Sequence, residues 1–233
     1  MLWDIDSTLV TVAGVSHRLF AAGLLAIAGR ELEWMPDLAG KTDSELAASV
    51  LRRHDVTLED GMLAAFHAAM IAAIDDCADE MRARGRALDG AHEAIAALAE
   101  VPGVVQSLVT GNLRPLAHTK LTLFGLTGHL DFDIGGYGGD SANRPVLVWL
   151  ARQRAAAKYK RLLPYHQIVV LGDTPHDVNA ARANNAIAIG VATGRTPAAD
   201  LTAAGAHAVL PSLVDTDMVL AAILRAGDPA TVT

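Results

Sequence analysis

Short apolar runs, each ending in a polar residue or a glycine, recur along the chain and constrain its fold more than any other feature. Because polar and apolar residues hardly alternate within these runs, they favour strands buried on both faces, as in a parallel sheet. The stretches between them have apolar residues at helical spacing and predict helices. Alternating strands and helices predict a doubly wound α/β sheet with right-handed crossovers. The predicted strands are 1–5, 104–109, 133–135 (the weakest), 167–171, 186–191 and 207–210, and the predicted helices are 91–98, 115–124, 145–156 and 178–184.

One long interval breaks this alternation. From about residue 12 to about residue 86 no convincing strand occurs, and the segment is rich in Ala, Leu and Met at helical spacing. We interpret it as an all-helical cap, inserted just after the first strand of a Rossmann-like core. The predicted domains are an α/β core at 1–11 and 87–226, a helical cap at 12–86, and a flexible tail at 227–233.

Composition excludes several classes of protein. The chain has 19 Lys and Arg against 26 Asp and Glu, a net charge of −7. Because phosphates repel an acidic chain, we expect neither nucleic acid nor an anionic membrane as a partner. The longest uncharged apolar run, residues 19–29, is shorter than the ~20 residues that a membrane helix needs. The one cysteine, Cys77, excludes a disulfide framework and fits a reducing, cytoplasmic compartment.

The beginning of the chain is also informative. It has acidic residues and no basic start, which is not typical of a signal peptide. Only three residues precede Asp4, whereas a strand normally has about 5–6 residues. The first strand therefore looks clipped, which leaves open a start further upstream.

Polar side chains follow the predicted strands at their carboxyl ends, where open parallel sheets bind their ligands. The first run ends at Asp4, with Asp6 two residues on, and the second ends at Thr110. The strongest run, 167–171, leads into Asp173, with Asp177 close behind. We expect these carboxylates and the hydroxyl to converge at one edge of the sheet.

Clustered carboxylates repel one another and raise each other's proton affinity, and a divalent cation removes this penalty. Mg²⁺ takes oxygen ligands, and typically one or two carboxylates plus substrate phosphate. The sequence thus indicates a magnesium site beside a phosphate site. Each aspartate alone is more often a helix N-cap or a turn residue. Four such elements in this order, all at strand ends, are much harder to obtain by chance.

These motifs resemble those of a known family. The segment Asp4-Ile5-Asp6-Ser7-Thr8-Leu9 is similar to the first signature of the haloacid dehalogenase-like hydrolase superfamily. Thr110 after an apolar strand resembles its second signature, and Asp173 with Asp177 resembles its fourth. The resemblance runs from residue 4 to about residue 191. The helical insert, with its loop Gly40-Lys41-Thr42-Asp43, is similar to the cap of the phosphoglycolate-phosphatase-like branch.

The resemblance implies a Mg²⁺-dependent phosphatase acting on a small phosphorylated metabolite. Asp4 would be the nucleophile that attacks phosphorus. Asp6 would protonate the leaving alkoxide and then deprotonate the water that cleaves the phosphoaspartate. Mg²⁺ would be held by Asp4, the backbone carbonyl of Asp6 and Asp173, while Asp177 would orient a metal-bound water or a nearby cation.

The resemblance also assigns the phosphate site and a role for the cap. Thr110, with the backbone N–H groups of Gly111 and Asn112, would bind the phosphoryl oxygens. Lys41 is a candidate for reaching from the cap to the leaving group, although an exposed lysine is the ordinary interpretation. His176, between the two aspartates of the fourth signature, is a weaker candidate for touching substrate.

Two positions depart from the family pattern. Its third signature is usually a lysine, and the candidate here is Arg144, whose planar guanidinium has a different geometry. The alternative is that Arg144 is a solvated residue before a helix. Lys158 and Lys160 are rivals late in the predicted helix, and Lys120 is discounted because it precedes the third strand. Ser7 stands where the family commonly has glycine, which narrows the backbone angles of that loop.

Three other functions stay open or are disfavoured. A sugar-phosphate mutase would use the same Asp4 and Asp6 but return the phosphoryl group to a sugar. A non-catalytic phosphate-binding or regulatory protein could share the fold, since fold does not fix function. A dehalogenase is disfavoured because it needs neither a metal nor a second acid. The sequence determines neither the substrate, for which phosphoglycolate is only a family-level suggestion, nor whether the protein is a monomer or a homodimer.

Overall fold

The core of the protein is a six-stranded, wholly parallel sheet. The computed structural model describes residues 1–226, so the tail predicted at 227–233 lies outside the described residues. The order of the strands is β5-β4-β1-β6-β7-β8. The predicted doubly wound α/β core is confirmed. The strands are β1 (Leu2–Trp3), β4 (Ser107–Thr110), β5 (Gly136–Tyr137), β6 (Val169–Gly172), β7 (Ile187–Val191) and β8 (Ala208–Leu210).

The order of the strands reverses at β1. After β1 the sheet grows through β4 and β5 on one side, and the chain then returns to β6 on the other side. A crevice for ligands forms where two connections leave the carboxyl ends of adjacent strands in opposite directions. This topology puts the residues that follow β1, β4 and β6 around one crevice.

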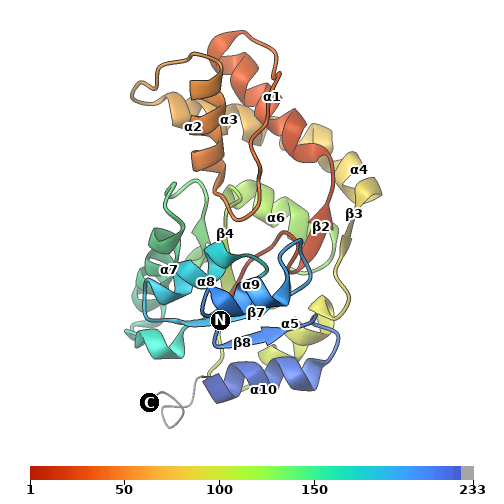
Figure 1. Cartoon of the computed structure of the whole chain (residues 1–233), viewed down its shortest axis with the longest axis vertical. Coiled ribbons are helices and arrows are strands. Elements are labelled where there is room, and N and C mark those ends of the chain that lie inside the picture. Colours follow the sequence, from red (N-terminus) through yellow and green to blue (C-terminus); the bar gives the residue numbers. More distant parts are fainter. Residues whose placement is uncertain (227–233) are drawn as a thin grey trace.

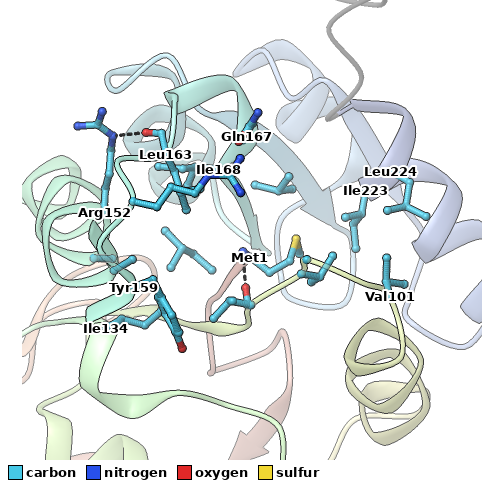
Figure 2. A pocket seen from close by; sticks show the side chains of 18 of the residues that line it. Met1, Val101, Ile134, Arg152, Tyr159, Leu163, Gln167, Ile168, Ile223 and Leu224 are labelled. Atoms are coloured by element: carbon cyan, nitrogen blue, oxygen red, sulfur yellow. Dashed lines mark hydrogen bonds between the residues drawn. The ribbon is translucent and has the colours of Figure 1, made fainter. Parts of the chain in front are cut away.

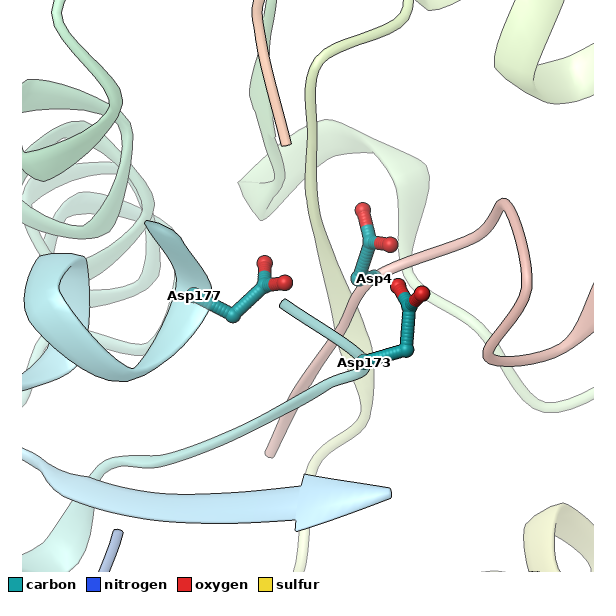
Figure 3. Close-up of side chains that lie close together, drawn as sticks. All are labelled: Asp4, Asp173 and Asp177. Atoms are coloured by element: carbon teal, nitrogen blue, oxygen red, sulfur yellow. The ribbon is translucent and has the colours of Figure 1, made fainter. Parts of the chain in front are cut away.

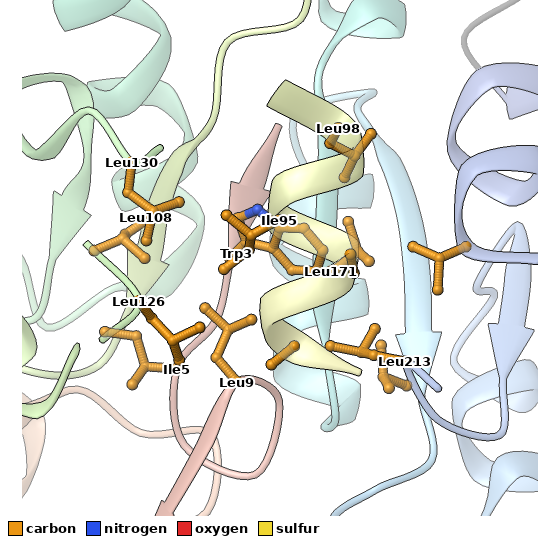
Figure 4. Packing of buried hydrophobic residues seen from close by; sticks show 14 of the residues in the cluster. Trp3, Ile5, Leu9, Ile95, Leu98, Leu108, Leu126, Leu130, Leu171 and Leu213 are labelled. Atoms are coloured by element: carbon orange, nitrogen blue, oxygen red, sulfur yellow. The ribbon is translucent and has the colours of Figure 1, made fainter. Parts of the chain in front are cut away.

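Helices cover both faces of the sheet. Side chains alternate along each strand, so Trp3, Leu108 and Leu171 lie in the cluster on one face. Figure 4 shows these three beside α5, with Ile95 and Leu98 of that helix packed over them. One face is covered by α5 (Ala91–Ala99), α6 (Arg114–Leu123) and α10 (Thr216–Ala226), and the other by α7 (Arg144–Tyr159), α8 (Pro175–Arg182) and α9 (Ala198–Ala203).

Four helices form a cap at one end of the molecule, above the core in Figure 1. They enclose an apolar cluster of their own, in which the rings of Phe20 and Phe66 lie 5.8 Å apart. Leu116 of α6 packs into this cap cluster, whereas Ala117 and Leu121 of the same helix belong to the core cluster. The cap helices are α1 (Val15–Ala28), α2 (Asp43–Arg53), α3 (Met62–Ala72) and α4 (Ile74–Arg84).

Two segments differ from the sequence-based expectation. A two-stranded antiparallel ribbon, β2 (Val10–Val12) with β3 (Gly85–Ala87), joins cap and core. Runs of three residues are too short to predict as strands. The strand predicted at 133–135 is instead a 3₁₀ turn at Phe132–Ile134, followed by β5. The Asp131 carboxylate accepts a bond from the Asp133 N–H at 3.1 Å and so caps this turn.

No helix within residues 1–226 is both long and apolar enough to cross a bilayer.

Candidate active site

Three buried carboxylates meet at the carboxyl ends of β1 and β6. Asp4 follows β1, and its N–H donates to the Leu171 carbonyl at 2.8 Å, which extends the pairing with β6. Asp173 follows β6, and Asp177 lies in the first turn of α8. Carboxylate oxygens of the three residues lie within 4.8 Å of one another (Figure 3). The structure thus brings Asp4 of the first signature together with both acidic residues of the fourth, whereas Asp6 is outside this cluster.

Asp177 is held in place by the start of its own helix. Its Oδ2 accepts from the Thr174 N–H at 3.1 Å and from the Thr174 hydroxyl at 2.7 Å, as part of a capping box. A Cβ at Gly172 would lie 2.2 Å from the carboxyl carbon of Asp177, so only glycine fits there. Local chemistry therefore fixes where this carboxylate points.

Arg144, at the start of α7, binds two of these carboxylates. Its Nη2 donates to Oδ1 of Asp4 at 2.7 Å and to Oδ1 of Asp177 at 2.6 Å. The arginine side chain is only 6% exposed, so it is not the solvated residue of the alternative interpretation. Lys158, one of its rivals, instead pairs on the surface with Asp131 and Asp133.

A second buried cation contacts Asp6 rather than Asp4. The Lys120 Nζ donates to both carboxylate oxygens of Asp6, at 2.7 and 2.8 Å, and to Oδ1 of Asn112 at 2.9 Å. Lys120, discounted above as a substitute for the family lysine, thus makes a contact with Asp6 that its sequence motifs do not predict. One sequence signal points to a buried lysine here: Lys120 lies on the same helix face as the apolar positions Ala117 and Leu121.

The phosphate-site candidates lie at the end of β4. The Thr110 side chain is fully buried, and its Oγ1 accepts from the backbone N–H of Asn112 at 3.2 Å and from its Nδ2 at 2.9 Å. These bonds use the acceptor side of the hydroxyl, so its proton can be donated to a ligand. Gly111 lies against the cap, because a Cβ there would be 2.0 Å from the Lys41 carbonyl oxygen.

The loop that precedes α2 in the cap lies directly on these strand ends. The Asp43 N–H donates to the Gly111 carbonyl at 2.7 Å, and Oδ2 of Asp43 accepts from the Leu113 N–H at 2.7 Å. The ring of His176 lies against Gly40, where a Cβ would be 2.4 Å from its Cδ2. Lys41 is half-buried within this loop. The cap thus forms the roof of the site.

Ser7 adopts the backbone conformation that glycine favours. Its φ is +61°, in the left-handed region, and its N–H donates to the Val10 carbonyl at 2.7 Å, which closes the loop after Asp6. A residue with a Cβ pays roughly 1–2 kcal/mol for this region. The Ser7 carbonyl in turn accepts from the Thr193 hydroxyl at 2.5 Å, so tertiary contacts hold the loop.

Burial and like charges control the protonation of the site. The pKa of Asp4 is raised well above its usual range, first by burial and then by Asp177, and burial with Asp177 raises the pKa of Asp173 to about 7. Burial alone would also raise the pKa of Asp6, but Lys120 and Asn112 lower it below its ordinary value.

The donor chemistry fits a hard divalent cation. The side chains that come together offer carboxylate oxygens only, which suit Mg²⁺ rather than a soft metal. When Asp4, Asp6, Asp173 and Asp177 are all ionised, the two buried cations leave two negative charges, which one divalent ion would balance. Asp173 is a more available ligand than Asp177, because both oxygens of Asp177 already accept hydrogen bonds.

The pKa of Asp43 leads to a prediction about stability. Burial raises it from 3.8 to about 7, although the Leu113 N–H and Lys120 act in the opposite direction. The folded state therefore binds the proton more tightly than the unfolded state, and stability falls as pH rises from about 4 to 7. We expect Asp43→Asn, which keeps an oxygen for the Leu113 N–H, to remove this loss.

Thermal melts between pH 4 and pH 8 test this expectation. At pH 8 the variant should be more stable by about 4 kcal/mol, or roughly 8–16 °C in Tm, with little difference at pH 4. Asp89→Asn is the matched control, because the Asp89 side chain is 81% exposed. A variant less stable than the natural protein at pH 8 would show that the charged form of Asp43 stabilises the cap.

One cavity lined mostly by apolar side chains lies away from these carboxylates. It has a volume of about 490 Å³ and lies at the amino ends of the strands, around Met1 and Ile168 (Figure 2). Apolar side chains dominate its lining, and none of the described residues that line it carries a carboxylate. The cavity therefore lacks the acidic groups that phosphoryl chemistry with a metal needs.

Fold and site together define an α/β protein with an aspartate centre at the switch point of a parallel sheet, roofed by a helical cap. The sequence model of the haloacid dehalogenase-like hydrolase family matches residues 1–182, and a HAD-hydrolase-like model matches residues 149–216. The chain belongs to the haloacid dehalogenase-like hydrolases, and the predicted family is confirmed.

Solved structures share this architecture across nearly the whole chain. CbbY from Rhodobacter sphaeroides, in complex with phosphate, is 18% identical with a TM-score of 0.65, over 92% of this chain and 94% of that one. A predicted phosphoglycolate phosphatase from Haemophilus somnus is 16% identical with a TM-score of 0.57, over 93% and 95%. A predicted phosphatase from Clostridium acetobutylicum is 17% identical with a TM-score of 0.60, over 94% and 96%. No curated protein matches the chain.

Proposed function

We propose that this protein is a Mg²⁺-dependent phosphatase that hydrolyses a small phosphorylated metabolite through a phosphoaspartate on Asp4. The observation that carries the proposal is the position of Asp4. It is buried at the switch point of the sheet, contacts Arg144 at 2.7 Å, and lies beside Asp173. A carboxylate next to a fixed cation at the mouth of such a crevice can meet a phosphoryl group without being repelled by it.

The chain's own residues account for the first displacement. A carboxylate oxygen of Asp4 forms a bond to phosphorus while the bond from phosphorus to the leaving oxygen breaks. Asp6, two residues further on, is the candidate that gives this oxygen its proton. The Thr110 hydroxyl and the N–H groups of Gly111 and Asn112 would hold the phosphoryl oxygens.

The second displacement reverses these roles. A water molecule attacks phosphorus, Asp6 takes its proton, and the bond from phosphorus to Asp4 breaks to release phosphate. The guanidinium of Arg144 holds Asp4 in position in both steps, and Asp177 holds Arg144.

Mg²⁺ fits the oxygen donors described above. Asp4, Asp173 and the backbone carbonyl of Asp6 would hold the ion. When bound, it neutralises charge on the nucleophile and on the phosphoryl oxygens.

The cap would choose the substrate. Lys41 and His176 both belong to or touch the loop that roofs the site, and they are the candidates for contacting the leaving group. The substrate proposed is therefore a metabolite small enough to be enclosed between this loop and the strand ends.

A phosphatase assay tests the proposal directly. With Mg²⁺ present, the protein should hydrolyse p-nitrophenyl phosphate, and EDTA should stop the reaction until excess Mg²⁺ is added back. A panel of phosphorylated metabolites, assayed by phosphate release, then identifies the substrate class.

Two results would redirect the proposal. Interconversion of hexose phosphates with little release of phosphate would identify a sugar-phosphate mutase. Binding of phosphate compounds without turnover, at saturating Mg²⁺, would identify a non-catalytic phosphate-binding protein.

A further inference from the structure

Lys120 is a buried cation outside the four signatures, and all of its bonds go to residues of the site. Its side chain is 8% exposed, and its ammonium group makes three hydrogen bonds, two to Asp6 and one to Asn112. An ammonium group has three protons, so each one is used. Burial of an unpaired ammonium group would cost free energy through desolvation, and these hydrogen bonds to Asp6 and Asn112 offset that cost.

Asp6 is fixed from two sides. Lys120 contacts both of its oxygens, and Nδ2 of Asn112 donates to Oδ2 at 2.7 Å. The same Nδ2 contacts Oγ1 of Thr110 at 2.9 Å, so the network continues to the phosphate-site hydroxyl. In this arrangement every side-chain partner of the Asp6 carboxylate is an N–H donor, and these bonds fix the orientation of the carboxylate.

The two buried cations therefore serve different aspartates. Arg144 contacts Asp4 and Asp177, whereas Lys120 contacts Asp6. The chain places the first cation on the nucleophile and the second on the residue that handles protons.

We propose that Lys120 is a positioning residue that holds Asp6 as the base for hydrolysis of the phosphoaspartate. This inference rests on the proposed phosphatase function. In the step concerned, a water oxygen bonds to phosphorus and the bond from phosphorus to Asp4 breaks. One water proton moves to Asp6, and Asp4 leaves as a carboxylate. The proton on Asp6 is then available for the leaving oxygen of the next substrate.

The choice of substrate separates this step from the first one. p-Nitrophenolate leaves without needing a proton, so formation of the phosphoaspartate from p-nitrophenyl phosphate does not depend on Asp6. Its hydrolysis does, because water must lose a proton. A variant without Lys120 should therefore be slow in the second step only.

Rapid-quench kinetics with p-nitrophenyl phosphate and Mg²⁺ measure both steps on the full chain. For Lys120→Met we expect a fast burst of about one p-nitrophenol per active site, followed by a steady rate lower by about 10²-fold or more. Lys120→Arg, which can still donate to Asp6, should recover much of the steady rate. Lys158→Met is the control, because Lys158 lies on the surface, and it should match the natural protein.

A double variant shows whether Lys120 acts through Asp6. If it does, adding Lys120→Met to Asp6→Asn should lower the steady rate no further than Asp6→Asn alone. Additive losses would overturn the inference. It would equally be overturned if burst and steady rates fell by the same factor in Lys120→Met, or if neither changed.

Two further outcomes are distinguished by design. If Lys120→Met does not fold, Lys120→Gln replaces it: its neutral amide should leave the burst unchanged and give a steady rate below that of Lys120→Arg. If the natural protein itself does not hydrolyse p-nitrophenyl phosphate, the proposed phosphatase function has failed first, and this inference fails with it.

Discussion

Asp4→Asn is expected to lower phosphatase turnover by about 10⁴-fold or more, in the range seen when a catalytic nucleophile is removed. An amide does not attack phosphorus, whereas the oxygen of asparagine can still accept the bond that Arg144 gives to Oδ1. Since burial already raises the pKa of Asp4, a neutral side chain should not destabilise the fold. Turnover of p-nitrophenyl phosphate and a thermal melt measure the two effects.

The control for this variant is Asp89→Asn, an exposed position remote from the strand ends in sequence. A quench experiment with labelled substrate should also find phosphate bound covalently to the natural protein but not to Asp4→Asn. Turnover by Asp4→Asn within tenfold of the natural rate would exclude Asp4 as the nucleophile.

Arg144→Met should damage both stability and activity. Without the guanidinium, Asp4 and Asp177 are left buried without their cation, and breaking a buried pair in this way costs about 3–5 kcal/mol. In a chain of this length the loss corresponds to a fall of roughly 6–20 °C in Tm. We also expect turnover to fall by about 10²-fold or more, because a preorganised charge beside the nucleophile is lost.

Arg144→Lys separates charge from geometry. Its ammonium group keeps the positive charge, but it lacks the planar guanidinium whose Nη2 contacts both carboxylates in Arg144. We expect intermediate stability and turnover. Assays well below the melting temperature of each variant keep unfolding out of the comparison. An unchanged rate in Arg144→Met would remove this residue from the catalytic site.

Most of the core could be predicted from hydropathy alone. The run at 167–171 corresponds to β6 and the run at 186–191 to β7, because these strands are buried on both faces and contain almost only apolar residues. β5 could not be located in this way. Its Gly136 is required because a Cβ would lie 2.2 Å from the Leu147 carbonyl oxygen, and such a glycine carries no hydropathy signal.

The candidate site was likewise predictable in part from the sequence. The positions of Asp4 and Asp173 follow from strand ends, because the topology of a parallel sheet brings those ends together. The contact of Lys120 with Asp6 joins residues 114 positions apart and depends on how far one flexible side chain reaches from α6. No local pattern encodes such a reach. The sequence predicted which residue could stand beside Asp4, but it could not reveal that Asp6 also has a cation.

Helix α6 has a consequence for protein engineering. Leu116 packs in the cap cluster, and Ala117 and Leu121 pack in the core cluster. Lys120 contacts Asp6 in the site between cap and core. The ten residues of α6 thus contact the cap, the core and the candidate active site. A change that displaces α6 in order to accept another substrate is therefore expected to alter specificity, stability and proton transfer together.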